Sequence, residues 1–143
     1  MTVYEGGCHC GNLRVAFETE QNPEEMVPRA CQCSFCRKHG TGAVSDPDGQ
    51  LTFTVRDPDQ VHLYRFGQKI TDFVICRVCG VYVGAHMPDG EGAYGNVMAK
   101  VLDGHERFPA DPVPVVRSRE NEEQRRARRR KAWSPSTIVT AGK

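Results

Sequence analysis

Three cysteines lie within six residues in the segment CQCSFC, at Cys31, Cys33 and Cys36, and two cations and His39 follow directly. Zinc held by protein alone takes four ligands, most often thiolates and imidazoles. Three thiolates leave a fourth position for an exogenous thiol, which loses its proton on coordination and becomes nucleophilic. Alternatively, His39 lies three residues after Cys36 and can close a structural site with no open position. The segment therefore predicts a zinc site that is either reactive or purely structural.

The other four cysteines form two widely separated pairs, Cys8 and Cys10 in GGCHCG, and Cys76 and Cys79 in CRVCG. A C-x2-C pair followed by glycine suits a tight turn in which both sulfurs face one ion and Gly80 adopts a positive φ. In an extended chain residues i and i+2 face the same side, so the C-x-C pair can share that ion. Together the pairs predict a closed four-thiolate zinc site that stabilises the fold. The alternative is a disulfide or free buried thiols.

Composition sets the context in which such sites work. The chain has 143 residues, of which 38% are hydrophobic, and a formal net charge of +1. One small domain is expected, and the overall charge demands neither nucleic acid nor an anionic membrane. The sequence shows neither a secretory leader nor an apolar run long enough for a membrane span, so seven cysteines favour metal binding over a disulfide framework. We therefore expect a soluble, cytoplasmic protein.

The elements that must position the cysteines are predicted to be short strands. Leu13, Val15 and Phe17 alternate with polar residues. Further strand-like segments follow at 51–56, 61–66, 72–76 and 81–86, separated by turn material rich in Pro, Asp and Gly. Only two places suggest helix: a short turn from about Ser34, and the segment 119–133, which has no apolar stripe and is expected to lie outside the core. The fold class is thus predicted to be mainly β.

The basic segment supports a hypothesis of a different class. Six cations come close together before Trp133: Arg125, Arg126, Arg128, Arg129, Arg130 and Lys131. Such a pattern can bind a phosphate backbone or an acidic partner, which makes a non-catalytic, zinc-stabilised binding module the alternative function. A solvated arm is favoured, because neighbouring glutamates offset part of the charge and the rest of the chain is not basic.

The order of the motifs resembles that of a known family. GGCHCG, the C-x-C-x2-C segment followed by Arg-Lys, CRVCG and the later VMAKVLDG together resemble the glutathione-dependent formaldehyde-activating enzymes, which include the centromere protein V type. The resemblance covers about residues 5–108 and all seven cysteines. It implies a β-tent fold with two zinc ions per chain. It also implies that Cys8, Cys10, Cys76 and Cys79 bind a structural zinc, and that Cys31, Cys33 and Cys36 bind a functional one.

The resemblance further implies a reaction, that of a carbon–sulfur lyase acting on a thiol adduct such as S-hydroxymethylglutathione, formed from glutathione and formaldehyde. In this setting Arg37 is a candidate for pairing with a substrate carboxylate, and His39 for carrying a proton. The expected partner is a small thiol, with neither a membrane nor nucleic acid. We expect a zinc-binding domain over residues 1–116 and a charged C-terminal extension over residues 117–143.

Overall fold

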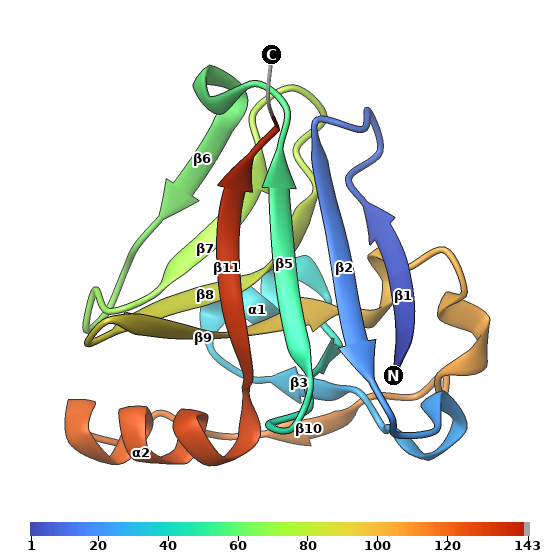
Figure 1. The fold of residues 1–143 in the computed structure, drawn as a ribbon. Coiled ribbons are helices and arrows are strands. Elements are labelled where there is room, and N and C mark those ends of the chain that lie inside the picture. The colour runs from blue at the N-terminus through green and yellow to red at the C-terminus, as the bar shows by residue number, and fades with distance from the viewer. Residues whose placement is uncertain (142–143) are drawn as a thin grey trace.

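Short strands make up most of the regular structure in the computed structural model, which describes residues 1–141 (Figure 1). The strands are β1 (Thr2–Gly7), β2 (Leu13–Thr19), β3 (Arg29–Cys31), β4 (Ala43–Val44), β5 (Gln50–Val55), β6 (Val61–Tyr64), β7 (Asp72–Cys76), β8 (Tyr82–Asp89), β9 (Gly92–Met98), β10 (Val113–Val115) and β11 (Ser134–Thr140). The helices are α1 (Ser34–His39) and α2 (Glu122–Ala132), with short 3-10 helices at Pro23–Glu25, Pro58–Gln60, Ala99–Val101 and His105–Arg107. Within residues 1–141 no helix combines the length and the apolar character that crossing a membrane requires. The predicted fold class, mainly β, is confirmed.

Alternation of apolar and polar residues identified five of these strands. β2, β5, β6, β7 and β8 each begin within one residue of the predicted position. In β2 the side chains of Leu13, Val15 and Phe17 are at most 2% exposed, whereas Arg14 between them is exposed. The helical turn expected from Ser34 is α1, which ends at Gly40 in the left-handed conformation. The local sequence pattern therefore predicted these elements, because each has one face in the core.

Two layers of strands meet along β11 (Figure 1). One layer holds β1, β2, β5 and β11, in which β11 runs parallel to β5 and the other neighbours are antiparallel. The other layer holds β6 to β9 in chain order, and β9 continues through β4 and β3 to β10. β11 belongs to both layers, because Ser134 and Pro135 pair with β9 whereas Ser136–Thr140 pair with β5. The last strand of the chain thus joins the two layers.

The main hydrophobic core takes side chains from both layers. Phe17 and Phe53 come from β2 and β5, and Val74, Val83 and Val97 from β7, β8 and β9, all at most 1% exposed. Burying each of these side chains stabilises the fold by roughly 1.5–3 kcal/mol. A second cluster gathers around β7 to β9 and the C-terminal segment, and it includes Phe73, Tyr82, Met87 and Trp133.

The basic segment is part of this architecture, and the prediction that it lies outside the core is wrong. Trp133, directly after α2, is 5% exposed, and the chain continues from it into β11. The inner face of α2 is formed by Arg129, whose guanidinium carbon lies 4.1 Å from the centre of the Trp133 ring. Because this face is built on a cation–π contact and not on aliphatic residues, hydrophobic periodicity does not reveal it.

Candidate functional site

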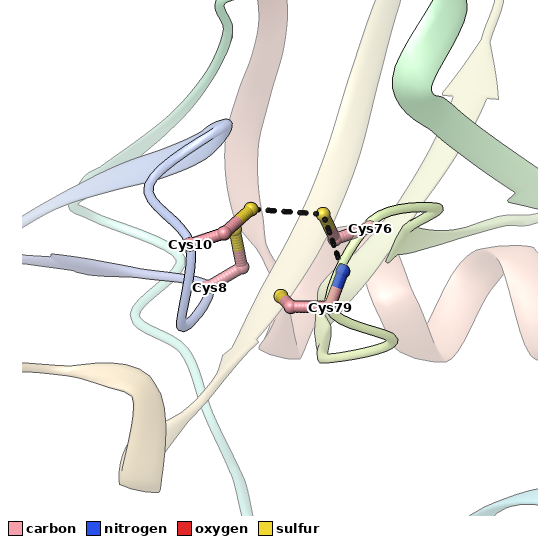
Figure 2. A group of neighbouring side chains, drawn as sticks. All are labelled: Cys8, Cys10, Cys76 and Cys79. Atoms are coloured by element: carbon pink, nitrogen blue, oxygen red, sulfur yellow. Dashed lines mark hydrogen bonds between the residues drawn. The ribbon is translucent and has the colours of Figure 1, made fainter.

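The four cysteines of the two separated pairs converge on one point (Figure 2). Their Sγ atoms all lie within 4.8 Å of one another, with 3.7 Å between Cys8 and Cys10 and 3.5 Å between Cys10 and Cys76. Tetrahedral zinc with zinc–sulfur bonds of about 2.3 Å places two sulfur atoms about 3.8 Å apart, whereas disulfide sulfurs lie about 2.0 Å apart. The four sulfurs, which form no disulfide, therefore fit a metal ion.

Turns from different layers present these sulfurs. The first pair lies in the connection between β1 and β2, and the second at the end of β7 and in the turn before β8. Gly80 adopts φ +82°, as predicted, and lets the chain reverse there. The backbone N–H of Leu13 donates to Cys8 Sγ at 3.2 Å, and that of Cys79 to Cys76 Sγ at 3.5 Å. These bonds hold the two sulfurs in place, and the group links the two layers.

The other three cysteines form a second group at the start of α1. Cys31 ends β3, Cys33 is the N-cap residue of α1, and Cys36 is buried in the first turn of that helix. Their Sγ atoms also lie within 4.8 Å of one another, and the backbone N–H of Cys36 donates to Cys33 Sγ at 3.4 Å. The structure therefore contains two groups of sulfurs, one of four and one of three, that can each hold a metal ion.

His39 is not part of the three-cysteine group. Its ring is packed instead against Phe35 and Tyr82, with ring centres 4.5 and 5.6 Å away. His39 and Arg37 are exposed on α1, and neither lines the cavity that adjoins the three cysteines and is described below. The arrangement thus gives no support to histidine as the fourth ligand, and the roles suggested for these two side chains stay predictions.

A cavity of about 190 Å³ adjoins the three-cysteine group, and all three cysteines line it. Part of its wall is apolar and aromatic, formed by Phe66, Phe73, Tyr82 and Trp133. Another part is cationic, formed by Arg29, Lys69, Arg117, Arg125, Arg128 and Arg129. A small molecule can therefore reach the sulfurs through a space with apolar and positively charged walls.

Charge is unevenly distributed among the three thiols. A hydrogen bond from Cys36 lowers the pKa of Cys31 to about 5, and the positive charge of Arg128 acts in the same direction. The same contact with Cys31, together with burial, raises the pKa of Cys36. Burial also raises the pKa of Tyr82 well above its ordinary value, so its hydroxyl is a neutral hydrogen-bond donor. Cys31 thus carries negative charge on sulfur more readily than Cys36.

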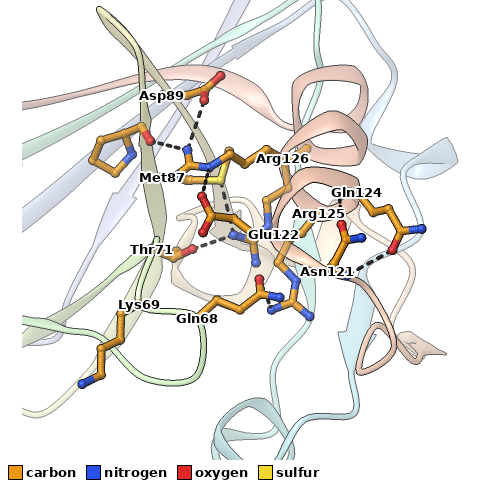
Figure 3. Close-up of polar contacts among 12 residues, drawn as sticks. Gln68, Lys69, Thr71, Met87, Asp89, Asn121, Glu122, Gln124, Arg125 and Arg126 are labelled. Carbon is orange, nitrogen blue, oxygen red and sulfur yellow. Dashed lines mark hydrogen bonds and ion pairs between the residues drawn. The ribbon is translucent and has the colours of Figure 1, made fainter.

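Sequence reasoning missed the cationic wall. It identified the arginines of residues 125–130 as a run of charge but placed them on a solvated arm, and it did not single out Arg29 or Arg117. Figure 3 shows how the helix is fixed: Arg125 donates to the side chain of Gln68 at 3.0 Å, and Arg126 to Asp89 at 3.1 Å. No local signal separates an arm from a docked helix, because the partners lie 37 to 57 residues away in the sequence.

We predict that the purified protein carries two zinc ions per chain. The expectation follows from the two groups of sulfurs, since thiolates at these spacings are zinc ligands. Elemental analysis of protein expressed with excess zinc measures the ratio directly. The double variant Cys31→Ser with Cys36→Ser is the control and is expected to carry one ion. A ratio of one or less in the unaltered chain would contradict the assignment.

Comparison with known proteins places this arrangement in a family. Residues 3–114 match the glutathione-dependent formaldehyde-activating enzymes, and this range includes all seven cysteines. A crystal structure of a Rhodobacter sphaeroides protein, a structural-genomics target, has 28% sequence identity and a TM-score of 0.52, and the match covers 77% of this chain and 97% of that one. No curated protein matches the chain. With its mainly β structure and two cysteine groups, the chain belongs to the family of glutathione-dependent formaldehyde-activating enzymes.

Proposed function

We propose that the protein is a zinc-dependent carbon–sulfur lyase that acts on a thiol adduct such as S-hydroxymethylglutathione. Family membership supports a glutathione-related role. The observation that carries the proposal is the three-cysteine group in the wall of a cavity. There, three sulfurs that can bind zinc line a space accessible to a small molecule, whereas the four-cysteine group can supply a full ligand set from the protein alone.

In this role Cys31, Cys33 and Cys36 would hold the zinc. When bound by three thiolates, zinc offers a fourth position at which a substrate sulfur is stabilised as thiolate. In the reaction the carbon–sulfur bond of the adduct breaks and its electron pair passes to sulfur. The hydroxyl group loses its proton as the carbonyl of formaldehyde forms, and the sulfur gains a proton on release, so that each adduct yields one thiol and one aldehyde.

The residues around the sulfurs supply charge and restrict water. Arg128, which contributes to the low pKa of Cys31, also stabilises negative charge that develops on a neighbouring substrate sulfur. Phe66, Phe73 and Trp133 provide an apolar wall in which such electrostatic effects are stronger than in water. His39 remains a candidate proton carrier at the exposed end of α1, and Arg37 a candidate contact for a substrate carboxylate.

A binding function through the basic segment is a weaker proposal. Arg125 and Arg128 pair with Glu120, and Arg126 and Arg130 pair with Asp89. Four of the six cations are therefore engaged in ion pairs within the chain, which leaves them less available to a phosphate backbone. We retain thiol chemistry as the proposed function.

Cobalt substitution tests this function. Bound cobalt shows sulfur-to-metal charge-transfer and ligand-field bands that report its ligands, and we expect glutathione to change them saturably. S-methylglutathione, which keeps both carboxylates but has no free thiol, is expected to leave them unchanged. Cys33→Ser should lose both the glutathione response and the release of formaldehyde from the adduct. If glutathione leaves the cobalt spectrum unchanged and His39→Ala loses the second metal ion, the three-cysteine group is a closed structural site and the proposal is wrong.

A further inference from the structure

The cavity beside the three-cysteine group carries a large excess of positive charge. Six cations line it and no lining residue is acidic. Glu120 approaches Arg125 and Arg128 at 3.4 and 2.7 Å and offsets one charge. A zinc ion with three thiolates offsets one more by simple addition. Four of the six positive charges are left without a counter-charge, and they border a space open to small molecules.

Arg117 and Arg129 show the imbalance most clearly. Neither makes an ion pair with any of residues 1–141, and the Nε atom of each is buried with no hydrogen-bond partner, whereas Nη1 of Arg129 donates to the hydroxyl of Thr71. Arg129 is 9% exposed, and burial together with neighbouring Arg128 lowers its pKa to about 9. Buried cations and unpaired donors cost free energy unless an anion completes them.

Arg29 adds a third guanidinium to the cavity, from the N-terminal part of the sequence. It lies on β3, two residues before Cys31, and within residues 1–141 its guanidinium has one hydrogen-bond partner, the hydroxyl of Ser45 at 2.7 Å. Arg117 and Arg128 line the same cavity as Arg29. Like charges are assembled here at a cost, next to the sulfurs, where a bound anion would relieve the repulsion.

We infer that Arg29, Arg117 and Arg129 form an anion subsite, and that the substrate thiol carries at least two acidic groups, carboxylate or phosphate. Guanidinium groups bind both kinds of acid through paired, charge-assisted hydrogen bonds. The sulfur end of this substrate rests on the proposed function, but the anion subsite does not. Arg117 and Arg129 lie beyond the residues 3–114 that match the family, so this subsite depends on the chain's own C-terminal segment.

Trp133 makes the subsite observable. It is the only tryptophan in the chain, it lines the cavity, and its ring stacks against Arg129. We therefore expect its fluorescence to change when an anion binds. The zinc-loaded full chain is titrated at constant ionic strength with succinate, inorganic phosphate and acetate. Succinate or phosphate should bind at least about tenfold more tightly than acetate, since each adds charge-assisted hydrogen bonds. The tighter of the two identifies the preferred acidic group.

Matched variants separate the subsite from general charge. Arg117→Gln and Arg29→Gln should each weaken dianion binding by about tenfold or more, and Arg117→Lys should retain part of the affinity. Lys131→Gln, which removes the same charge from an exposed position of α2 outside the cavity, should bind as the unaltered chain does. A melting curve of each variant shows whether it folds. If one of the two glutamine variants does not fold, dianion binding by the other tests the subsite. Equal binding of acetate and the dianions, or unchanged dianion binding in the folded variants, would overturn the inference.

Two further titrations keep the subsite and the thiol chemistry apart. Mercaptosuccinate and 2-mercaptoethanol are each added to the cobalt-substituted chain. Mercaptosuccinate should change the cobalt spectrum at a concentration at least about tenfold lower than 2-mercaptoethanol, because it contacts both the metal and the anion subsite. Succinate binding without any thiol response of cobalt would leave the anion subsite in place and reject the proposed function. If cobalt responds equally strongly to both thiols and succinate does not bind, the proposed function is retained and the anion subsite is rejected.

Discussion

Cys79→Ser is expected to lower the free energy of unfolding by about 4 kcal/mol or more, which corresponds to a fall in melting temperature of roughly 10–15 °C for a domain of this size. The reason is that the four-cysteine group ties the connection between β1 and β2 to the turn between β7 and β8, and these belong to different layers. Metal binding at such a site is coupled directly to folding. Circular dichroism melts in zinc-containing buffer measure the effect. Cys8→Ser, which removes a sulfur from the connection between β1 and β2, should lower the melting temperature to a similar extent.

Cys33→Ser provides the matched control. Its group is drawn from residues 31–36 alone, so a metal ion there holds no distant parts of the chain together. We expect a fall in melting temperature well below that of Cys79→Ser, accompanied by complete loss of the thiol response. Equal destabilisation by the two substitutions would indicate that both groups are structural and that the proposed chemistry has no site.

A chain ended at Ala132 is expected to lose cooperative unfolding altogether. This truncation removes Trp133, which is 5% exposed, and β11, which pairs with β5 in one layer and with β9 in the other. Without them the layers separate, and β5 and β9 present unpaired backbone groups to water. We expect the near-ultraviolet circular dichroism to disappear and the protein to aggregate.

The control for this truncation retains the strand and removes only charge. Arg130→Gln with Lys131→Gln alters two exposed positions of α2 and should change the melting temperature by no more than about 3 °C. A truncated chain that still melts cooperatively would show that β11 is dispensable. It would also restore the idea that the C-terminal segment is an appendage.

The cysteine groups and half of the strands could be predicted because their signals are local. The C-x2-C turn with Gly80 is encoded within five residues, and the alternation in Leu13–Thr19 within seven. β11 could not be predicted in the same way. Its segment contains Pro135, and its place between two strands depends on partners 39 to 85 residues away in the sequence.

The cationic wall was beyond sequence reasoning for a related reason. Arg125 to Arg130 form the same pattern whether they lie in water or against a cavity, and only the position of the helix decides between the two. Arg29 carries no signal at all, because one arginine before a cysteine motif is unremarkable until β3 is placed opposite the C-terminal segment. The sequence therefore predicts which residues bind metal better than which residues contact a substrate.

The position of β11 in the sequence, after the strands with which it pairs, also determines the order in which the two layers can be completed. The four-cysteine group lies within residues 8–79, whereas residues 134–140 are synthesised later. A growing chain thus acquires its metal-binding cysteines long before its sheet can close. During this interval the edges of β5 and β9 are open to strands of other chains, which is the stage at which association between nascent molecules is most favoured. A metal ion bound early by the four-cysteine group would hold the connection between β1 and β2 and the turn between β7 and β8 together until β11 is inserted.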